Sequence, residues 1–251
     1  MAELVFLGTA SAVPDERHEN TYMAVRGRLG TLLIDCANNT FVRLEQAGIP
    51  FQSIRDIILT HFHPDHVSGL PSLLLNMWLM GRQQPVTIYG LSYTLERMEK
   101  LMEFYDWATW PGFYPVNFRD IPQQELSPVL ENEEMRVIAS PVHHLIPNIG
   151  LRVEFLEVGK SLAYSCDTEP CAEVMRLARG VDVLIHEAAG QALGHTSAAQ
   201  AGEIARDAGA KALYLIHYET RSKDTTTLLA QARQSFSGPV TLAEDFMKVI
   251  F

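Results

Sequence analysis

The chain has 251 residues, of which 47% are hydrophobic and 20% charged, so one domain over residues 1–251 can bury a core of ordinary size. Its formal net charge of −10 argues against a broad nucleic-acid-binding surface, because clustered Lys and Arg bind phosphate backbones. We find neither the roughly 18 consecutive apolar residues of a membrane span nor a secretory leader. Cys36, Cys166 and Cys171 cannot all pair, so we expect no disulfide framework and a cytoplasmic protein.

Strand and helix patterns alternate along the first half of the chain. Short apolar runs predict strands at residues 4–10, 22–26, 31–35, 54–60 and 86–89. Helical spacing of apolar residues predicts helices at residues 40–47, 70–81 and 93–105. Residues 104–118 break the pattern with many aromatic side chains around Pro111 and Pro115. This segment is interpreted either as a loop packed on the core or on a second subunit, or as a wall or lid over a substrate pocket.

The second half repeats this alternation. Strands are predicted at residues 135–141, 150–158, 161–165, 181–186, 212–217 and near Val240. Helices are predicted at residues 171–178, 197–208 and 225–236. Because both halves read as β-rich units with helices outside, we expect an α/β protein, arranged as a four-layer α/β/β/α sandwich.

Metal-ligand side chains are concentrated between residues 61 and 66, directly after a short apolar run. On an extended segment His61 and His63 point to one side, because side chains alternate with a period of two. Pro64 ends the strand, and the turn can direct Asp65 and His66 toward a second point. Since imidazole and carboxylate ligands suit zinc, manganese or iron, the cluster predicts a site for two divalent ions.

Further strand ends carry side chains of the same kind. Asp167, His217 and the pair His143-His144 each follow an apolar run that is predicted to be a strand. A single strand-end Asp or His is more often a cap or a satisfied core residue. Together with the first cluster, these residues instead indicate one metal site at a common end of the sheets.

Residues 60–66, Thr-His-Phe-His-Pro-Asp-His, resemble the THxHxDH motif of the metallo-β-lactamase superfamily. Other segments resemble its ribonuclease Z branch, which is related to phosphodiesterases and arylsulfatase-like enzymes. They are residues 6–14 (FLGTASAVP), 33–36 (LIDC), 144–152 (HLIPNIGLR), 164–168 (YSCDT), 186–188 (HEA) and 194–198 (GHTSA). The resemblance extends over nearly the whole chain in order, and it implies the four-layer fold and a hydrolase.

The resemblance also implies the ligands of two metal ions. One ion would be held by His61, His63 and His144, the other by Asp65, His66 and His217, with Asp167 as the bridge. His144 is chosen over His143 because it precedes the Ile-Pro-x-x-Gly stretch, as in the family. Zinc is the expected metal, with manganese and iron as alternatives.

The catalytic residues implied by the resemblance are Asp65, Glu187 and His195. Two divalent ions would lower the pKa of a bridging water and so supply hydroxide at neutral pH. Asp65 would bind metal and orient this hydroxide, while His195, held by Glu187, would donate a proton to the leaving oxygen. We therefore expect a phosphodiesterase that acts on a small phosphodiester or on RNA.

Two departures from the ribonuclease Z pattern make tRNA 3′ processing the less favoured activity. That enzyme carries a long tRNA-gripping arm between the Gly-x-Arg strand and the strand before the bridging Asp. Here the segment between Arg152 and Leu162 has room only for a tight hairpin. The DCGEGTQ segment of the family also reads DCANNT at residues 35–40.

Other activities of the same fold remain as alternatives, namely arylsulfatase-like, lactone or thioester hydrolysis. The segments at residues 6–9 and 194–198 point away from the lactone and thioester enzymes. A redox di-iron protein would be expected to replace His63 by a carboxylate, and a binding protein to lack ligands; neither change is present. We expect no membrane partner, and the aromatic segment and the family favour a homodimer.

Overall fold

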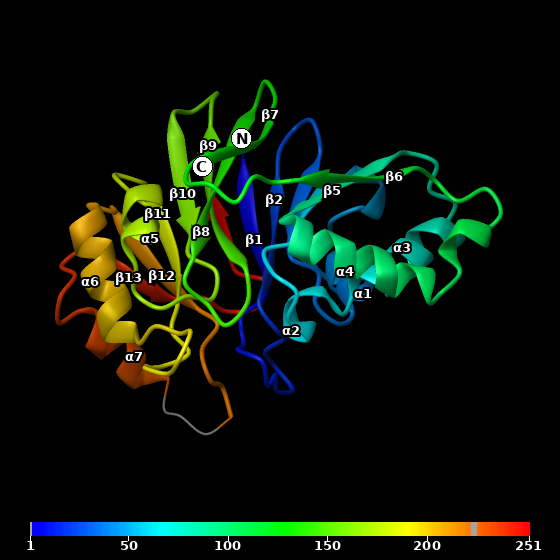
Figure 1. Cartoon of the computed structure of the whole chain (residues 1–251). Helices are drawn as coiled ribbons and strands as arrows, with labels where there is room; N and C mark the ends of the chain where they lie inside the picture. Colours follow the sequence, from blue (N-terminus) through cyan, green and yellow to red (C-terminus); the bar gives the residue numbers. More distant parts are fainter. Residues whose placement is uncertain (1, 222–224) are drawn as a thin grey trace.

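A computed structural model describes residues 2–221 and 225–251 (Figure 1). The first half contains β1 (Glu3–Gly8), β2 (Tyr22–Arg26), β3 (Thr31–Ile34), α1 (Thr40–Gln46), β4 (Ile54–Ile58), α2 (Pro64–Val67), α3 (Leu70–Leu79), β5 (Val86–Gly90), α4 (Ser92–Glu103) and β6 (Val116–Asp120). The second half contains β7 (Ser127–Glu131), β8 (Met135–Val142), β9 (Asn148–Phe155), β10 (Lys160–Tyr164), α5 (Ala172–Leu177), β11 (Val183–Glu187), α6 (Ala198–Ala208), β12 (Ala212–Ile216), α7 (Thr226–Ala232), β13 (Val240–Leu242) and β14 (Lys248–Ile250).

The strands form two mixed sheets of seven strands each. The first has the order β14-β1-β2-β3-β4-β5-β6, and the second has the order β13-β12-β11-β10-β9-β8-β7. Strands β3 to β6 are parallel in the first sheet, as are β10 to β13 in the second. The carboxyl ends of parallel strands meet at one edge of a sheet, which is where α/β proteins place their ligands.

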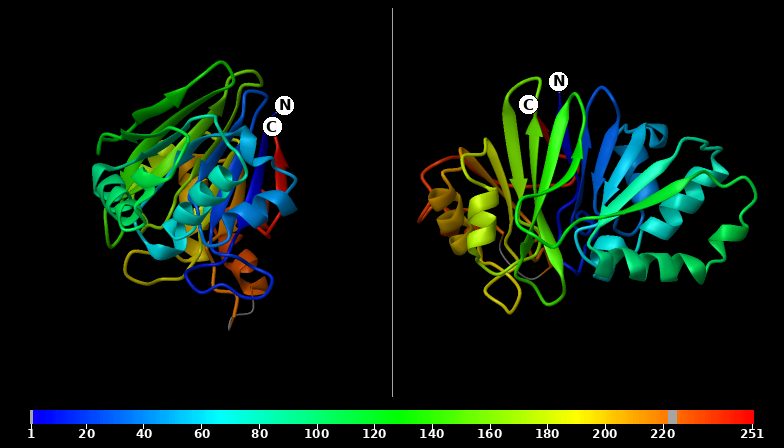
Figure 2. Two further views of the ribbon diagram at one scale, coloured as in Figure 1. Left: turned by 90° about the vertical axis from the view of Figure 1, so that its right-hand side faces the viewer. Right: turned by 45° about the horizontal axis from the view of Figure 1, so that its top comes forward.

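Three buried apolar clusters show that the structure has four layers. The central cluster joins both sheets, with Phe6 and Met23 of the first packed with Leu151 and Leu162 of the second. A second cluster lies between the first sheet and helices α1, α3 and α4, and a third between the second sheet and helices α5, α6 and α7. Figures 1 and 2 show the helices on the two outer sides and the sheets between them. The predicted four-layer α/β/β/α sandwich is confirmed.

Local sequence signals explain several of these elements. Helix α6 begins with a capping box, in which Ser197 accepts a hydrogen bond from the Gln200 amide and Gln200 accepts one from the Ser197 amide. It ends at Gly209, which has a φ of +67°. Such an N-cap and a left-handed glycine satisfy backbone groups that helix ends leave without partners.

The β9–β10 hairpin is tight, as the sequence predicts. Its strands pair from Phe155 opposite Lys160 to Leu151 opposite Tyr164. The turn between them comprises residues 156–159, and Gly159 adopts a φ of +62°. No arm is inserted at this position of the chain.

The aromatic segment at residues 104–118 packs on the outer side of the first sheet. Trp110 stacks on Trp78 of α3 with ring centroids 5.2 Å apart, and the Trp78 indole N–H donates to the carbonyl oxygen of Pro111. In Figure 1 this segment lies at the far end of α4, well separated from α2, which begins directly after His63. Its position agrees with a loop packed on the core and not with a lid over the histidine cluster.

Candidate metal centre

The carboxyl ends of strands from both sheets bring the predicted ligands together. The cluster from His61 to His66 follows β4, His144 follows β8, Asp167 follows β10 and His217 follows β12. Asp35 directly after β3, Cys166 two residues after β10 and His217 directly after β12 have φ values of 65°, 52° and 53°. The left-handed region is uncommon for residues other than glycine and is concentrated at functional sites. The chain therefore turns sharply after β3, β10 and β12, where these strands reach the site.

His61, His63 and His144 direct ring nitrogens to a common point. The His63 Nδ1 atom lies 3.0 Å from His61 Nε2 and 3.1 Å from His144 Nε2. Nitrogens at zinc distances of about 2.0–2.1 Å in a tetrahedron lie roughly 3.3 Å from one another. The spacing of these three nitrogens therefore fits one tetrahedral metal ion.

A second group consists of Asp65, His66, Asp167 and His217. The Asp167 Oδ2 atom lies 3.2 Å from His217 Nε2, 3.5 Å from His66 Nε2 and 3.9 Å from His61 Nε2. Asp65 Oδ2 lies 3.6 Å from His66 Nε2. Asp167 thus stands between the two groups.

Three buried atoms in this second group have no hydrogen-bond partner among the described residues. They are His66 Nε2, Asp167 Oδ1 and His217 Nδ1. Leaving such an atom unpaired costs about 1–3 kcal/mol, and more for a charged group. Imidazole nitrogens and carboxylate oxygens are atom types that bind zinc and similar ions, so the donor set fits a divalent metal.

Protonation also favours metal binding. Burial lowers the pKa of His61 well below its ordinary value and lowers the pKa of His217 to about 4. Burial acts in the same direction on His63 and His144, so these rings are neutral at pH 7. Burial would also lower the pKa of His66, but Asp167 and Asp35 outweigh it and raise the pKa well above its ordinary value. A divalent ion would take the place of that His66 proton.

Asp35 supports His66 from behind, a role that we did not assign from the sequence. Its fully buried carboxylate accepts hydrogen bonds from His66 Nδ1 at 2.8 Å and from the Thr60 amide at 2.8 Å. A carboxylate behind a metal-binding histidine fixes the orientation and tautomer of the ring. The available signal was the position of Asp35 at the end of a predicted strand.

Gly194 supports His144 in a similar way. His144 Nδ1 donates to the Gly194 carbonyl oxygen at 2.8 Å, which leaves Nε2 toward His63. Gly194 has a φ of +79°, and a Cβ atom there would lie 2.9 Å from His144 Nδ1. Only glycine combines this backbone conformation with such a close approach.

His143 differs clearly from its neighbour. Its side chain is 62% exposed, and its Nε2 atom lies 3.6 Å from Glu173. His144, in contrast, faces His61 and His63. The structure thus brings His144 into the cluster and leaves His143 outside it.

Glu187 and His195 form a hydrogen-bonded pair beside the metal ligands. His195 Nδ1 lies 2.9 Å from Glu187 Oε1, and the ring packs against those of His144 and His217. Glu187 is fully buried and also accepts hydrogen bonds from the amides of Thr168 and Ala189. Burial raises the pKa of Glu187 to about 7, and the hydrogen bond to Glu187 raises the pKa of His195. The pair therefore retains a proton near neutral pH.

Comparisons with known proteins agree with this geometry. The profile of the beta-lactamase superfamily domain matches residues 31–218. Ribonuclease Z of Methanothermobacter thermautotrophicus is 33% identical over an alignment of 306 positions, gaps included, which covers 99% of this chain and 96% of that protein. Since this chain has only 251 residues, the relative contains several dozen residues without a counterpart here.

Two solved structures share the fold over their full length. The short form of human tRNase Z gives a TM-score of 0.79 at 27% identity and covers 99% of this chain and 98% of its own. The metallo-beta-lactamase fold protein YhfI of Bacillus subtilis gives a TM-score of 0.85 at 20% identity, with the same coverage. No helix in residues 2–221 or 225–251 is long and apolar enough to cross a membrane.

The profile match and the similarity to ribonuclease Z show that the chain belongs to the metallo-β-lactamase superfamily of metal-dependent hydrolases and resembles its ribonuclease Z branch.

Proposed function

We propose that this protein is a phosphodiesterase that uses two divalent ions, zinc in the first instance, on small or short nucleic-acid phosphodiesters. The observation that carries the proposal is the Glu187–His195 pair beside two convergent groups of metal ligands. Ligand groups alone would serve any hydrolase of the fold. A proton donor held next to them is needed when the leaving group is a poor one, such as the alkoxide of a nucleoside.

The proposed ligand assignment follows the two groups. One ion would be held by His61, His63 and His144, the other by Asp65, His66 and His217, with Asp167 between them. Bound there, the ions would lower the pKa of a water molecule and neutralise charge on the phosphoryl oxygens.

The chain's own residues would orient the reaction and move its protons. Asp65, whose carboxylate is partly buried, would accept a hydrogen bond from the attacking water. His195 donates through Nδ1 to Glu187, which leaves Nε2 to give a proton to the leaving oxygen. The water oxygen forms the new bond to phosphorus, the ester bond to the leaving oxygen breaks, and that oxygen receives the His195 proton.

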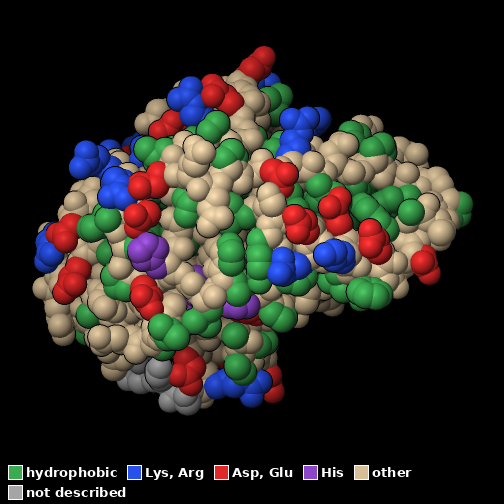
Figure 3. Space-filling model, viewed as in Figure 1, with side chains coloured by type: hydrophobic (Ala, Val, Ile, Leu, Met, Phe, Trp, Pro, Cys, Tyr) green, Lys and Arg blue, Asp and Glu red, His purple; other side chains and the backbone are tan. Residues whose placement is uncertain are grey.

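Three observations favour a small substrate over tRNA. The β9–β10 turn holds only residues 156–159, so the arm by which ribonuclease Z grips tRNA has no counterpart at that position. The net charge is −10. On the face shown in Figure 3, basic and acidic side chains are interspersed, without the continuous basic stripe that long nucleic acids require.

The test is hydrolysis of bis(p-nitrophenyl) phosphate and p-nitrophenyl sulfate by the zinc-loaded protein. His144→Ala and His66→Ala should each reduce phosphodiester turnover by more than about 100-fold, beyond the effect of losing a residue that merely supports a ligand. His143→Ala, at the neighbouring exposed position, should retain wild-type activity. Full activity in His66→Ala would refute the assignment, and cleavage of the sulfate alone would favour an arylsulfatase.

We also propose a homodimer, supported by exposed apolar side chains at the outer end of α3 and α4. Leu79, Met80, Phe104 and Tyr105 are 67%, 58%, 86% and 53% exposed. Exposed apolar clusters of this kind are typical of protein contact surfaces. Light scattering should give twice the chain mass for the wild type and a monomer for Phe104→Glu; a monomeric wild type would contradict the proposal.

A further inference from the structure

The loop between β11 and α6 carries Gly194 and His195, and part of it is open to solvent. Leu193, the residue before Gly194, is 76% exposed. Hydrogen bonds within the loop close it on itself, since the Gly190 amide donates to the Thr196 carbonyl at 3.2 Å. Such internal bonds do not attach the loop to the metal ligands, so its position depends on contacts with other segments.

Glu169 connects this loop to two other segments of the site. Its Oε1 atom accepts a hydrogen bond from the Gly194 amide at 2.9 Å. Its own amide donates to the His143 carbonyl at 2.8 Å. Glu169 lies two residues after Asp167, the residue proposed to stand between the two ions. One residue therefore joins the segments that follow β8, β10 and β11.

Gly194 contacts a proposed metal ligand and precedes the proposed proton donor. Its carbonyl oxygen accepts from His144 Nδ1 at 2.8 Å, and the next residue in the chain is His195. The rings of His144 and His195 pack with their centroids 5.1 Å apart. A shift of Gly194 would therefore move the acceptor behind His144 and the backbone of His195 together.

The chemistry of the contact suits an anchor for this loop. Gly194 has a φ of +79° and no side chain that could restrict its backbone. A hydrogen bond from a backbone amide to a carboxylate is charge-assisted, and such bonds are roughly twice as strong as those between neutral groups. Glu187 holds the ring of His195, whereas Glu169 holds the backbone beside it. Glu169 is only half-buried, so its side chain can be replaced without opening the core.

We propose that Glu169 is a positioning residue, which acts through Gly194 on both His144 and His195. It holds the Gly194 carbonyl in place behind the ring of His144 and keeps the His195 backbone at the metal centre. The role toward His195 rests on the proposed phosphodiesterase function. The role toward His144 requires only that the site binds metal.

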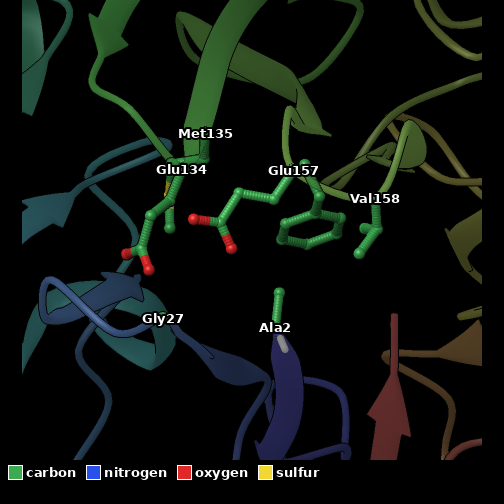
Figure 4. A pocket seen from close by; sticks show the side chains of 7 residues that line it. Ala2, Gly27, Glu134, Met135, Glu157 and Val158 are labelled. Atoms are coloured by element: carbon green, nitrogen blue, oxygen red, sulfur yellow. The ribbon is translucent and has the colours of Figure 1, made fainter.

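Glu134 provides a matched carboxylate at the other end of the molecule. Its two oxygens accept from the amides of Arg28 and Leu29, each at 2.7 Å, in the turn between β2 and β3. Figure 4 shows Glu134 beside a cavity of about 10 Å³, which has room for at most one water molecule. Ala2 also lines this cavity, which lies at the end of the sheets that carries the chain termini, opposite α2 (Figure 1). Glu134 thus holds loop amides as Glu169 does, but away from the metal centre.

The experiment compares Glu169→Ala, Glu169→Gln and Glu134→Ala with the wild type. Zinc titration of the metal-free proteins by calorimetry measures the affinity for each ion. Hydrogen exchange of the zinc-loaded proteins, read by mass spectrometry, measures local opening of residues 188–197. Kinetics with bis(p-nitrophenyl) phosphate and diphenyl phosphate measure how strongly the rate depends on the leaving group, because phenol leaves less readily than p-nitrophenol. The thermal unfolding midpoint of each variant reports on its folding.

Glu169→Ala should bind one zinc ion about three- to tenfold more weakly, which is less than the about 10- to 100-fold usual for direct partners of metal ligands. Its rate should fall about tenfold more on diphenyl phosphate than on bis(p-nitrophenyl) phosphate, a part of the about 10²- to 10⁴-fold that a general acid contributes. Hydrogen exchange in residues 188–197 should be faster. Glu169→Gln keeps an acceptor oxygen of the same reach and should recover most of both losses. Glu134→Ala should match the wild type in zinc affinity and in the ratio of the two rates, even where its unfolding midpoint is lower.

The inference is overturned if Glu169→Ala binds both ions with wild-type affinity, if the ratio of its two rates is unchanged, or if Glu169→Gln is impaired to the same extent. Equal losses in Glu134→Ala would also overturn it, because they would show a general loss of stability. The zinc affinities do not depend on turnover. A wild type that hydrolyses neither ester would refute the proposed function, and weaker zinc binding by Glu169→Ala would still support the role of Glu169 toward His144.

Discussion

Replacing Asp35 by Asn tests how much the metal centre depends on the support behind His66. Asp35 is fully buried. Its Oδ2 accepts from His66 Nδ1 and its Oδ1 from the Thr60 amide, each at 2.8 Å, and the Thr60 hydroxyl also donates to the carboxylate. Asn keeps the size of the side chain and tolerates the φ of 65° at this position. Only one of the two acceptors is therefore changed.

Either orientation of the new amide leaves a conflict. If its NH₂ group faces the Thr60 amide, two buried donors meet, at a cost of about 1–3 kcal/mol. If it faces His66, the ring must accept at Nδ1 and carry its proton on Nε2, the atom proposed to bind metal. A penalty of about 1–3 kcal/mol corresponds to roughly 5- to 150-fold in affinity. This range agrees with the about 10- to 100-fold loss usual for partners of metal ligands.

The assay is zinc titration of the metal-free protein, read by calorimetry and followed by turnover of bis(p-nitrophenyl) phosphate. Asp35→Asn should bind one zinc ion about 10- to 100-fold more weakly, with the other unchanged. Asp120→Asn, at an exposed position of β6, is the matched control. Wild-type affinity for both ions in Asp35→Asn would refute this account of the Asp35–His66 pair.

Three further predictions follow from the same geometry. His195→Ala should slow cleavage of alkyl phosphodiesters by about 10²- to 10⁴-fold and cleavage of p-nitrophenyl esters much less, because only poor leaving groups need a proton. Equal losses of rate on both substrates would exclude the proton-donor role. Gly194→Ala should weaken binding at His61, His63 and His144 in a zinc titration, because its Cβ would lie 2.9 Å from His144 Nδ1. Gly112→Ala controls for the left-handed backbone, since its φ of +66° is similar and a Cβ there meets nothing within 4 Å; equal effects of the two would show that backbone strain alone is responsible. Removing metal with a chelator should lower the free energy of unfolding by about 4 kcal/mol if the ion had been present at 1,000 times its Kd. His66 Nε2 and Asp167 Oδ1 would then have no hydrogen-bond partner among the described residues, and an unchanged thermal unfolding midpoint would argue against a bound ion.

The sequence alone determines the layers and most of the ligand candidates. Apolar runs that end in His61, Asp167 or His217 predict both a buried strand and a polar site at its end, because a parallel strand buried on two faces needs a near-continuous apolar run. The short link between Arg152 and Leu162 likewise predicts the tight β9–β10 hairpin. These signals are local, so neighbouring residues are sufficient to reveal them.

Three strands were not predicted from the sequence, and several boundaries differ. They are β6 (Val116–Asp120), β7 (Ser127–Glu131) and β14 (Lys248–Ile250). All three form edges of their sheets, and β14 has three residues paired with β1 from the other end of the chain. The predicted helix at residues 225–236 is shorter in the structure, where α7 extends over Thr226–Ala232. The ends of elements depend on tertiary contacts more than on the local pattern. Pairing partners distant in sequence leave no local periodicity.

Only the tertiary structure decided which polar residues meet. The pattern of the sequence alone leaves His143 and His144 equivalent, and the fold turns one to Glu173 and the other to His63. Thr9 shows the same dependence, because its carbonyl accepts from the His217 amide while its hydroxyl donates to Asp245, 236 residues away. Such contacts form where loops from both sheets converge at one edge. The packing of the sheets therefore sets the positions of the hydrogen-bond donors and acceptors, and the spacing of the residues along the chain does not.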